Sequence, residues 1–169
     1  TSRARRMLSR PLEAEDLSQA VGYYVPGRTD DVARLAFSPT LRGYLWSFPR
    51  VDHLAVGACA PLAGGTAASL WGEVDAYLAR LDPTLDRSRL PRYSALIPAL
   101  SPAALRANPI AGPGWMLGGD AAGSVDPLTR EGIAPGLRSA ALAADAVLSG
   151  CPERYALDWK RELQDELLW

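Results

Sequence analysis

The sequence predicts an α+β fold, in which an antiparallel sheet with flanking helices precedes a C-terminal strand-loop-helix unit. The first observation is a series of short strand patterns, which cover residues 21–25, 32–37, 41–48 and 53–58. Their short connections predict an antiparallel meander, and a sheet of this kind with one solvent-facing side can form the floor of a pocket. Residues 89–98 are expected to return as a further strand toward that pocket.

The second observation is a set of helical patterns in the rest of the chain. A helix that ends before Pro83 has its apolar residues on one face, at Leu70, Val74, Tyr77, Leu78 and Leu81. A last helix is expected to bury Tyr155, Trp159, Leu163 and Leu167, which recur at helical spacing. Between these two helices, an Ala-rich helix is predicted from about Gly132 to Ser149, where Gly150 ends it.

Composition narrows the functional classes. With 169 residues, 48% of them hydrophobic, the chain can bury a core of its own. The net charge of −1 gives no field that would attract nucleic acid. No apolar run approaches the ~20 residues of a spanning helix, and Cys59 and Cys151 form no disulfide framework, so we expect a cytoplasmic protein. His53 is the only histidine and has no ligand partner at metal-site spacing, so no metal is assigned.

Residues 115–136 organise the second half of the chain. Trp115 to Leu117 reads as a short buried strand, after which Gly118 and Gly119 allow close approach to the backbone. Asp120 follows among small residues, where its carboxylate can accept hydrogen bonds from ligand hydroxyls. The N-terminal N–H groups of the Ala-rich helix point back toward that position and favour a negatively charged ligand. The alternative is an ordinary strand-turn-helix connection with a capping aspartate.

The Ala-rich helix has an apolar face of its own. Its residues recur at helical spacing at Ile133, Leu137, Ala141, Ala144 and Leu148. Pro135 is tolerated because it falls in the first turn. The small alanines allow close packing on a neighbour, so we expect exposed apolar surface on this helix.

The strand pattern at residues 43–50 is rich in aromatic residues. Strict alternation sends Tyr44, Trp46 and Phe48 to one face of the strand, and Leu45 and Ser47 to the other. Three large rings on one face are typical of core packing, and they are equally able to line a pocket for an apolar molecule.

The Gly-Asp-Ala-Ala-Gly and Pro-Leu-Thr-Arg-Glu-Gly-Ile segments together resemble the second flavin-binding motif of FAD-dependent oxidoreductases related to geranylgeranyl reductases and aromatic-ring hydroxylases. The resemblance implies that Asp120 binds the ribityl chain of FAD and that residues 127–133 pass beside the isoalloxazine. The cofactor-binding residues it implies are Gly119, Asp120, Ala121, Gly123, Pro127, Arg130, Gly132 and Ile133.

The aromatic strand adds to this resemblance. Its Tyr-x-Trp-x-Phe-Pro pattern is similar to the one that lines the substrate cavity in geranylgeranyl reductases, which implies that Tyr44, Trp46 and Phe48 bind substrate. It is also similar to the Trp-x-Trp-x-Ile-Pro of flavin-dependent halogenases, from which Tyr44 and Phe48 depart. Ring hydroxylases carry histidine at the position of Gly123 and glycine at that of Arg130, so these two residues favour the reductase branch. Arg130 either offers charge to the substrate or flavin edge, or is a surface arginine.

The resemblance also bears on the extent of the chain. Ser2 and Arg5 match the end of an Asp-Gly-x-x-Ser-x-x-Arg segment of the family, and no Gly-x-Gly-x-x-Gly turn is present to hold the FAD pyrophosphate. We therefore expect the C-terminal part of a longer protein. The tail of the FAD-binding domain would be residues 1–19, and the substrate domain residues 20–110. The second FAD motif with its helix would follow at residues 111–150, and a C-terminal helix at residues 151–169.

The implied function is reduction of carbon-carbon double bonds in an apolar, isoprenoid-like molecule, by hydride transfer from reduced flavin. The implied partners are that small-molecule substrate and an external electron donor such as NAD(P)H or ferredoxin, and a membrane would be met only through a lipid substrate. No catalytic acid or base is assigned. The alternatives are a flavin-dependent monooxygenase or halogenase and, from another class, a non-catalytic binding module that retains only the pocket.

Overall fold

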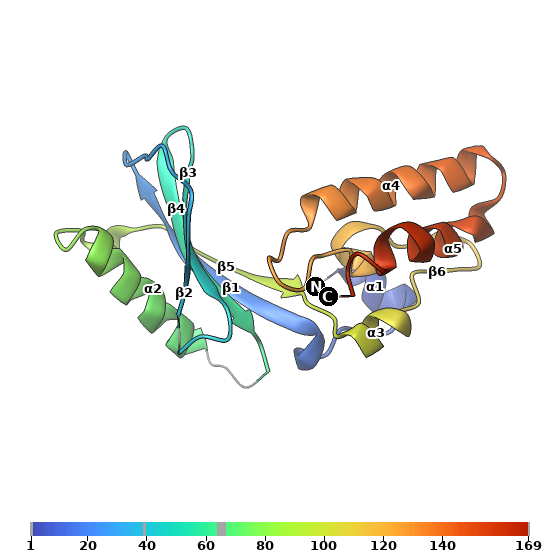
Figure 1. Cartoon of the computed structure of the whole chain (residues 1–169), viewed down its shortest axis with the longest axis horizontal. Coiled ribbons are helices and arrows are strands. Elements are labelled where there is room, and N and C mark those ends of the chain that lie inside the picture. Colours follow the sequence, from blue (N-terminus) through green and yellow to red (C-terminus); the bar gives the residue numbers. More distant parts are fainter. Residues whose placement is uncertain (1, 39, 64–66, 169) are drawn as a thin grey trace. The chain divides into compact units, whose positions relative to one another are not determined.

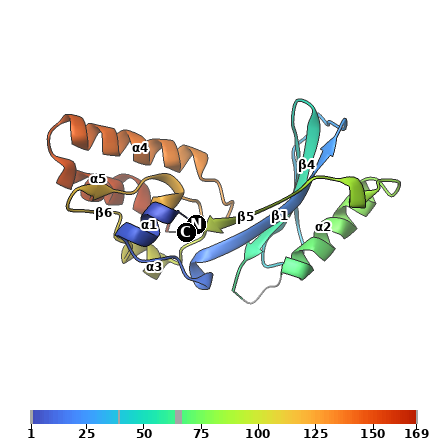
Figure 2. The same ribbon diagram turned by 180° about the vertical axis from the view of Figure 1, so that it is seen from behind.

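The computed structural model describes residues 2–38, 40–63 and 67–168 and divides into two compact units. One unit contains residues 18–96, and the other combines residues 1–17 with 97–169. Figures 1 and 2 show the first as a sheet covered by one long helix, and the second as a group of helices around short irregular segments. The segment boundaries expected from the flavoprotein resemblance, near residues 19, 110 and 150, stay a prediction.

The sheet has five strands in the order β2-β3-β4-β1-β5. Its strands are β1 (Leu17–Pro26), β2 (Arg34–Phe37), β3 (Tyr44–Pro49), β4 (His53–Pro61) and β5 (Arg92–Pro98). The β2–β3, β3–β4 and β4–β1 pairs are antiparallel. The antiparallel sheet and the returning strand β5 are therefore confirmed.

The expected meander is confirmed for β2, β3 and β4 and is wrong for β1, which pairs with β4 and not with β2. Burial explains the difference. Strands β1 and β4 are the longest and are buried along most of their length, whereas β2 is short and largely exposed. A meander would leave β1 without β4 beside it, whereas the observed order places both long apolar strands inside the sheet and β2 at its edge.

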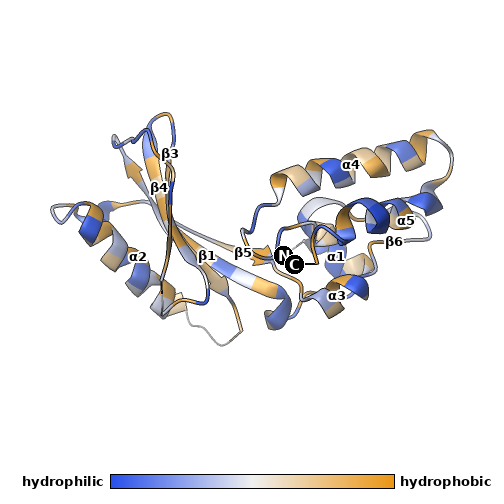
Figure 3. Cartoon of the chain, in the orientation of Figure 1, coloured by the Kyte–Doolittle hydropathy of each residue, from blue (hydrophilic) through white to orange (hydrophobic). Residues whose placement is uncertain are grey.

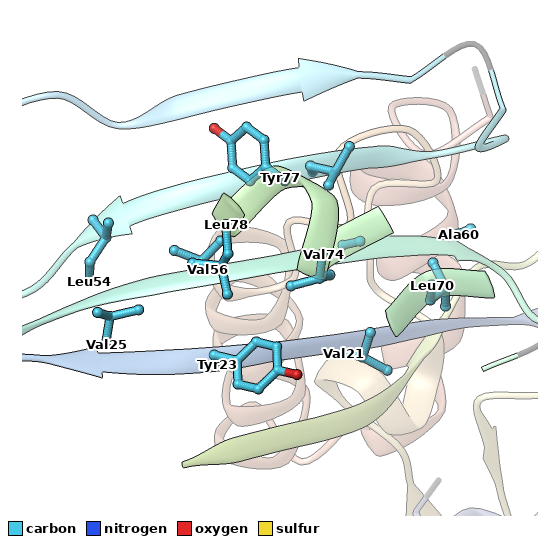
Figure 4. Packing of buried hydrophobic residues seen from close by; sticks show 12 residues of the cluster. Val21, Tyr23, Val25, Leu54, Val56, Ala60, Leu70, Val74, Tyr77 and Leu78 are labelled. Atoms are coloured by element: carbon cyan, nitrogen blue, oxygen red, sulfur yellow. The ribbon is translucent and has the colours of Figure 1, made fainter. Parts of the chain in front are cut away.

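Helix α2 (Ala67–Leu81) covers one face of the sheet, packing on β3 and β4. Its predicted apolar face is confirmed, since Leu70, Val74, Tyr77 and Leu78 are buried and Leu81 is partly buried. Figure 4 shows Leu70, Val74, Tyr77 and Leu78 next to side chains from the strands. The strand residues in this core are Val21, Tyr23, Val25, Leu45, Leu54, Val56, Ala58 and Ala60. In β1 and β4, every second residue therefore belongs to the core, and the residues between them face away from α2.

The second unit is mostly helical. Its regular elements are α1 (Arg3–Leu8), α3 (Pro102–Arg106), the two-residue strands β6 (Ala111–Gly112) and β7 (Trp115–Met116), α4 (Ile133–Leu148) and α5 (Tyr155–Trp159). The predicted strand at Trp115 and the Ala-rich helix are confirmed. Among the described residues, no helix combines the length and apolar character needed to cross a bilayer.

The C-terminal helix carries the core of this unit. Tyr155, Trp159, Leu163 and Leu167 are all buried, as their spacing predicts. In an α-helix, a spacing of four residues drifts by about 40° per step. The turn at Lys160–Gln164 is a π-helical turn, which is wider and reverses this drift, so the four side chains stay on one face.

Helix α4 leaves apolar side chains in solvent. Ile133 is 78% exposed and Leu148 is 85% exposed, and Leu137 and Val147 are also exposed. Figure 3 shows hydrophobic colouring at several places along the α4 ribbon. One side of α4 and the β6–β7 hairpin form an apolar groove of about 1000 Å³. The expected exposed apolar surface is therefore present.

Candidate functional site

The Gly-Asp segment forms a tight turn directly after β7. Gly119 to Ala122 make a single 3-10 turn, with φ of 55° at Gly119 and 72° at Gly123. The N–H of Ser124 donates to the carbonyl oxygen of Gly119 at 3.0 Å and closes the turn. Glycine suits both positions because other residues rarely adopt positive φ.

Buried side chains hold this turn against the C-terminal helices. The Oγ of Ser139 on α4 accepts a hydrogen bond from the N–H of Gly119 at 2.8 Å. The hydroxyl of Tyr155 donates to the carbonyl oxygen of Leu117 at 2.6 Å, and the indole N–H of Trp159 donates to the Oγ of Ser124 at 3.0 Å. Burial raises the pKa of Tyr155 to about 12, so its phenol remains a donor throughout the physiological range.

Arg5 and Asn108 hold the other side of the turn. The guanidinium of Arg5, only 1% exposed, donates to the carbonyl oxygen of Ala121 at 2.8 Å and to the Oδ1 of Asn108 at 2.6 Å. The amide of Asn108 donates in turn to the carbonyl oxygen of Ala122 at 2.7 Å. Arg5 and Asn108 therefore fix the two peptide carbonyls that follow Asp120, and we call this pair the carbonyl clamp.

Asp120 lies in the turn with its side chain exposed. A Cβ atom at Gly132 would lie 3.2 Å from the Asp120 Oδ1 and 3.2 Å from a methyl group of Val125. The carboxylate therefore sits beside the residue that precedes α4, and a larger residue than glycine at position 132 would crowd it. An exposed carboxylate at this position can accept hydrogen bonds from a ligand, as the sequence predicts.

The N-terminus of α4 differs from the prediction. The N–H groups of Ile133 and Ala134 both donate to the Oε1 of Glu131, at 2.7 and 2.8 Å. Glu131 therefore takes the place that the sequence analysis gave to a ligand beside Asp120, and the expected ligand contact stays a prediction. The physical reason is local: a carboxylate just before the helix satisfies its first N–H groups at little entropic cost.

The loop before α4 is closed by its own hydrogen bonds. The N–H of Asp126 donates to the carbonyl oxygen of Glu131 at 2.8 Å, and that of Arg130 donates to the carbonyl oxygen of Asp126 at 3.0 Å. Burial acts to raise the pKa of Asp126, but hydrogen bonds from Thr129 and Leu128 lower it overall. Pro127 and Arg130 are half-buried here, and Arg130 has a φ of 61°, a conformation that costs about 1–2 kcal/mol without glycine.

The aromatic row lies on the sheet face opposite α2. Leu45 belongs to the core under α2, while the rings of Tyr44, Trp46 and Phe48 follow one another at centroid separations of 5.7 and 6.0 Å. The predicted alternation is confirmed. On this face lies a cavity of about 630 Å³, lined by Tyr24, Pro26, Trp46, Phe48, Arg50, Asp52, His53, Ala55 and Tyr93. Tyr44 is not among these residues and extends the row beyond the cavity.

A pair of glycines supports the rings of this cavity. Gly22 on β1 and Gly57 on β4 are direct partners in the sheet. A Cβ at Gly22 would lie 2.4 Å from the Tyr93 hydroxyl, and one at Gly57 would lie 2.6 Å from it and 2.5 Å from the Trp46 ring. The tyrosine and tryptophan rings therefore rest directly on the sheet backbone. Burial raises the pKa of Tyr93 to about 12.

The sequence analysis did not identify some of these residues as part of a site. The rings of Tyr24 and Tyr93 are in contact with their centroids 4.7 Å apart, and the centroid of His53 lies 5.1 Å from that of Tyr24. The available signal was a glycine inside each of the two strand patterns, since such a glycine often marks close approach of another group. For Arg5 the signal was its match to the family segment, while nothing in the sequence indicated Asn108.

Comparisons with known proteins agree with this geometry. The chain is 36% identical over 128 residues to a menaquinone reductase of Mycolicibacterium smegmatis. The matched residues are 74% of this chain and 31% of the relative. A geranylgeranyl bacteriochlorophyll reductase-like protein from Thermoplasma acidophilum superposes with a TM-score of 0.71 at 22% identity, over 94% of this chain and 42% of that protein. No family model matches the chain.

A tryptophan halogenase from Shewanella frigidimarina has a TM-score of 0.61 at 14% identity, over 92% of this chain and 31% of its own. The chain thus spans less than half the length of each of these relatives. At such identities the two solved structures establish the fold. The resemblance that the Gly-Asp and aromatic motifs predict is confirmed, and the chain has the fold of the geranylgeranyl reductase-like flavoproteins.

Proposed function

We propose that this chain is the part of an FAD-dependent oxidoreductase that holds the flavin's ribityl side and the substrate, and that the enzyme reduces carbon-carbon double bonds of an apolar, isoprenoid-like molecule. The observation that carries the proposal is the exposed Asp120 carboxylate beside Gly132, in a turn fixed from both sides by buried hydrogen bonds. A relative of this chain is named a menaquinone reductase, and menaquinone carries an isoprenoid tail.

The residues of the turn fit a flavin. Asp120 offers carboxylate oxygens to ribityl hydroxyls, and Gly119, where an added Cβ would meet only the Cα of Gly136 at 3.9 Å, leaves space for close approach. Ala121 and Gly123 are assigned through the resemblance alone, since a Cβ at Gly123 would meet Leu100 at 2.9 Å. Pro127, Arg130 and Gly132 lie on the segment that leads into α4, and Ile133 is the first residue of this helix. Of these residues, Gly132 lies beside the Asp120 carboxylate. When bound, the flavin supplies the hydride. A ligand oxygen that takes the N–H groups of Ile133 and Ala134 has to displace Glu131, which holds them now.

The substrate is assigned to the aromatic face. Tyr44, Trp46 and Phe48 offer apolar rings on the side of the sheet away from the core, and two of the three line a cavity. Rings in this position bury an apolar molecule from water without filling the protein's own core. The electron donor, NAD(P)H or ferredoxin, is part of the proposal and has no residue assigned to it.

The cofactor assignment is tested by Asp120→Ala in the full-length protein. Loss of a charged hydrogen-bond acceptor costs on the order of 1.5–3 kcal/mol, so FAD affinity should fall roughly ten- to hundredfold by titration. Asp145→Ala is the matched control, because Asp145 is an exposed carboxylate near the other end of α4. Equal FAD affinity in wild type and Asp120→Ala would remove Asp120 from the site.

The reaction is tested by anaerobic photoreduction of the full-length protein, followed by mixing with prenylated substrates or with oxygen. Reoxidation by a prenylated molecule, with a product that gains two hydrogens in its mass spectrum, is the expected result. Reoxidation by oxygen with transfer of an oxygen atom would support the monooxygenase alternative. Protein purified without flavin bands, and unable to acquire them from added FAD, would support the binding module.

A further inference from the structure

We propose that the pocket binds an amphipathic substrate in one orientation. The oxygen-bearing head ring lies at the β3–β4 turn, against Arg50 and His53, and the apolar prenyl tail runs along the aromatic row to Phe37 at the sheet edge. This inference rests on the proposed function and adds to it a head subsite and a tail path, which involve residues outside the aromatic motif.

The polar end of the cavity comes from a single turn. Arg50, Asp52 and His53 all line the cavity and lie between the last residues of β3 and the start of β4. The N–H of Arg50 donates to the carbonyl oxygen of His53 at 2.8 Å, which closes the turn. The Nδ1 of His53 is 2.6 Å from the Oδ1 of Asp52, so its Nε2 is the ring nitrogen left for a ligand.

The chemistry of this end suits oxygen atoms on a ring. The Arg50 guanidinium donates hydrogen bonds to carbonyl oxygens, and the His53 Nε2 serves a carbonyl when protonated or a hydroxyl when neutral. The centroid of the Tyr24 ring lies 5.1 Å from that of His53 and 4.7 Å from that of Tyr93. Because Tyr93 and Trp46 rest on the Gly22–Gly57 pair, the floor beneath these groups is built of rings. A planar head group fits such a surface.

The apolar path leads away from this end. From Phe48, beside the turn, the rings continue through Trp46 and Tyr44 along β3. On the neighbouring edge strand, Phe37 pairs with Tyr44, and their ring centroids are 6.3 Å apart. Phe37 is 74% exposed, and Leu35, which pairs with Trp46, is 56% exposed. The four rings and Leu35 form a strip, hereafter the tail strip.

The shape of the tail strip favours an extended chain. A compact apolar molecule would be accommodated by the cavity and would leave Phe37 and Leu35 in water. A long prenyl tail covers them and gains about 25 cal/mol for each Å² of apolar surface removed from water. The polar groups stand at one end of the strip, so the head and the tail of an amphipathic molecule have different preferred positions.

The test measures equilibrium binding to the full-length protein by dialysis, with 2-methyl-1,4-naphthoquinone and its derivatives bearing prenyl tails of increasing length. In wild type, affinity should rise with tail length. Phe37→Ala should weaken the long-tailed compounds about five- to tenfold and leave the tail-less compound unchanged. Leu157→Ala removes an exposed leucine from α5 and serves as the control without effect.

The head subsite is tested with Arg50→Met and His53→Phe, which keep much of the apolar bulk and remove the polar groups. Each should weaken every compound of the series by about tenfold, the tail-less one included. Phe37 is exposed, so Phe37→Ala should fold as wild type, and melting temperatures check this for all variants.

Several outcomes would overturn the orientation. One is that Phe37→Ala weakens the affinity equally for all tail lengths. Another is that Arg50→Met weakens the affinity for long-tailed compounds only. The third is that Phe37→Ala leaves the affinity for every compound unchanged and weakens only binding to lipid vesicles. If the naphthoquinones bind and reoxidise the flavin but Phe37 and Arg50 have no effect, the orientation alone is refuted. If no member of the series binds, the orientation and the isoprenoid-like substrate are both refuted.

Discussion

The Gly-Asp turn and the aromatic cavity are built in opposite ways. In the turn, the backbone is the functional surface, and buried polar side chains from distant parts of the chain hold its carbonyls and N–H groups in place. In the cavity, the side chains are the surface, and a bare stretch of sheet backbone supports them. Glycine serves both, by adopting positive φ in the turn and by lacking a side chain under the rings.

This contrast predicts different sensitivities. A turn held by hydrogen bonds should fail when one buried donor is removed, because several acceptors lose their partner together. A ring surface lying on glycine should tolerate changes in the rings and fail when a methyl group is added beneath them. The following variants test these two expectations, from the largest effect to the smallest.

Arg5→Met should have the largest effect. It removes the buried donor of the carbonyl clamp and leaves the carbonyl of Ala121, the carbonyl of Arg10 and the Oδ1 of Asn108 without this partner. Each lost partner costs ~1–3 kcal/mol, so we expect a loss on the order of 3–5 kcal/mol in the free energy of unfolding, measured by denaturant titration. Arg6→Met, at an exposed neighbouring position, should change it by less than ~0.5 kcal/mol. Comparable losses in both variants would contradict the clamp.

Gly57→Ala tests the glycine support of the cavity. The new methyl group would meet the Trp46 ring, the Tyr93 hydroxyl and the carbonyl oxygen of Val21, all within 2.6 Å. Overpacking of this kind costs ~1–3 kcal/mol, and the displaced rings should also reduce binding in the cavity. The matched control is Gly72→Ala in α2, where a Cβ meets nothing within 4 Å and helix propensity gains ~0.5–1 kcal/mol. Equal stability of Gly57→Ala and wild type would show that the rings do not need the glycine.

Tyr155→Phe and Tyr93→Phe compare one buried tyrosine from each region. The Tyr155 hydroxyl donates at 2.6 Å and the Tyr93 hydroxyl at 3.3 Å, so the first variant should lose about 1 kcal/mol and the second much less. Burial raises both pKa values to about 12. Since the unfolded pKa is about 10, their contribution to stability is complete below pH ~10 and is lost as the pH rises toward ~12. Between pH ~10 and ~12, the free energy of unfolding should fall less steeply with pH in each phenylalanine variant than in wild type. An equal slope in variant and wild type would contradict the burial effect.

Arg130→Gly should have the smallest effect on stability. It relieves the positive φ at this position but increases the freedom of the unfolded chain, for a net gain of at most about 1 kcal/mol. If the Arg130 side chain serves the substrate or the flavin, turnover should fall while the melting temperature rises slightly. Unchanged turnover would make Arg130 a surface arginine.

Much of the architecture could be predicted from the sequence because it depends on periodicity and chain breakers. The apolar faces of α2 and of the C-terminal helix, the bounds of α4 and the alternation of the aromatic strand all follow from residue spacing. Where local spacing does not decide, the prediction was wrong. The strand order depends on which strands bury most surface together, and so β1 lies beside β4 rather than β2.

The candidate sites show the same division. Asp120, its glycines and the Tyr44-Trp46-Phe48 row were found from motif and alternation, although their roles stay a proposal. The capture of the first N–H groups of α4 by Glu131 was missed, because the sequence does not show whether a local carboxylate or a ligand satisfies them. Tyr24, Tyr93 and Phe37 were missed as partners of the aromatic row, because they come from three other strands.

The sequence by itself determined the longer helices and the main strands, the faces they bury and the two motifs of the flavoprotein resemblance, because these depend on residues within a few positions of each other. Only the tertiary structure decided what supports them: Arg5 and Asn108 behind the Gly-Asp turn, and Gly22 and Gly57 beneath Trp46 and Tyr93. Such contacts do not follow from local spacing, and the one between Arg5 and Ala121 spans 116 positions. They exist because buried carbonyls require donors and buried rings require space, and the closed fold determines which residues provide them.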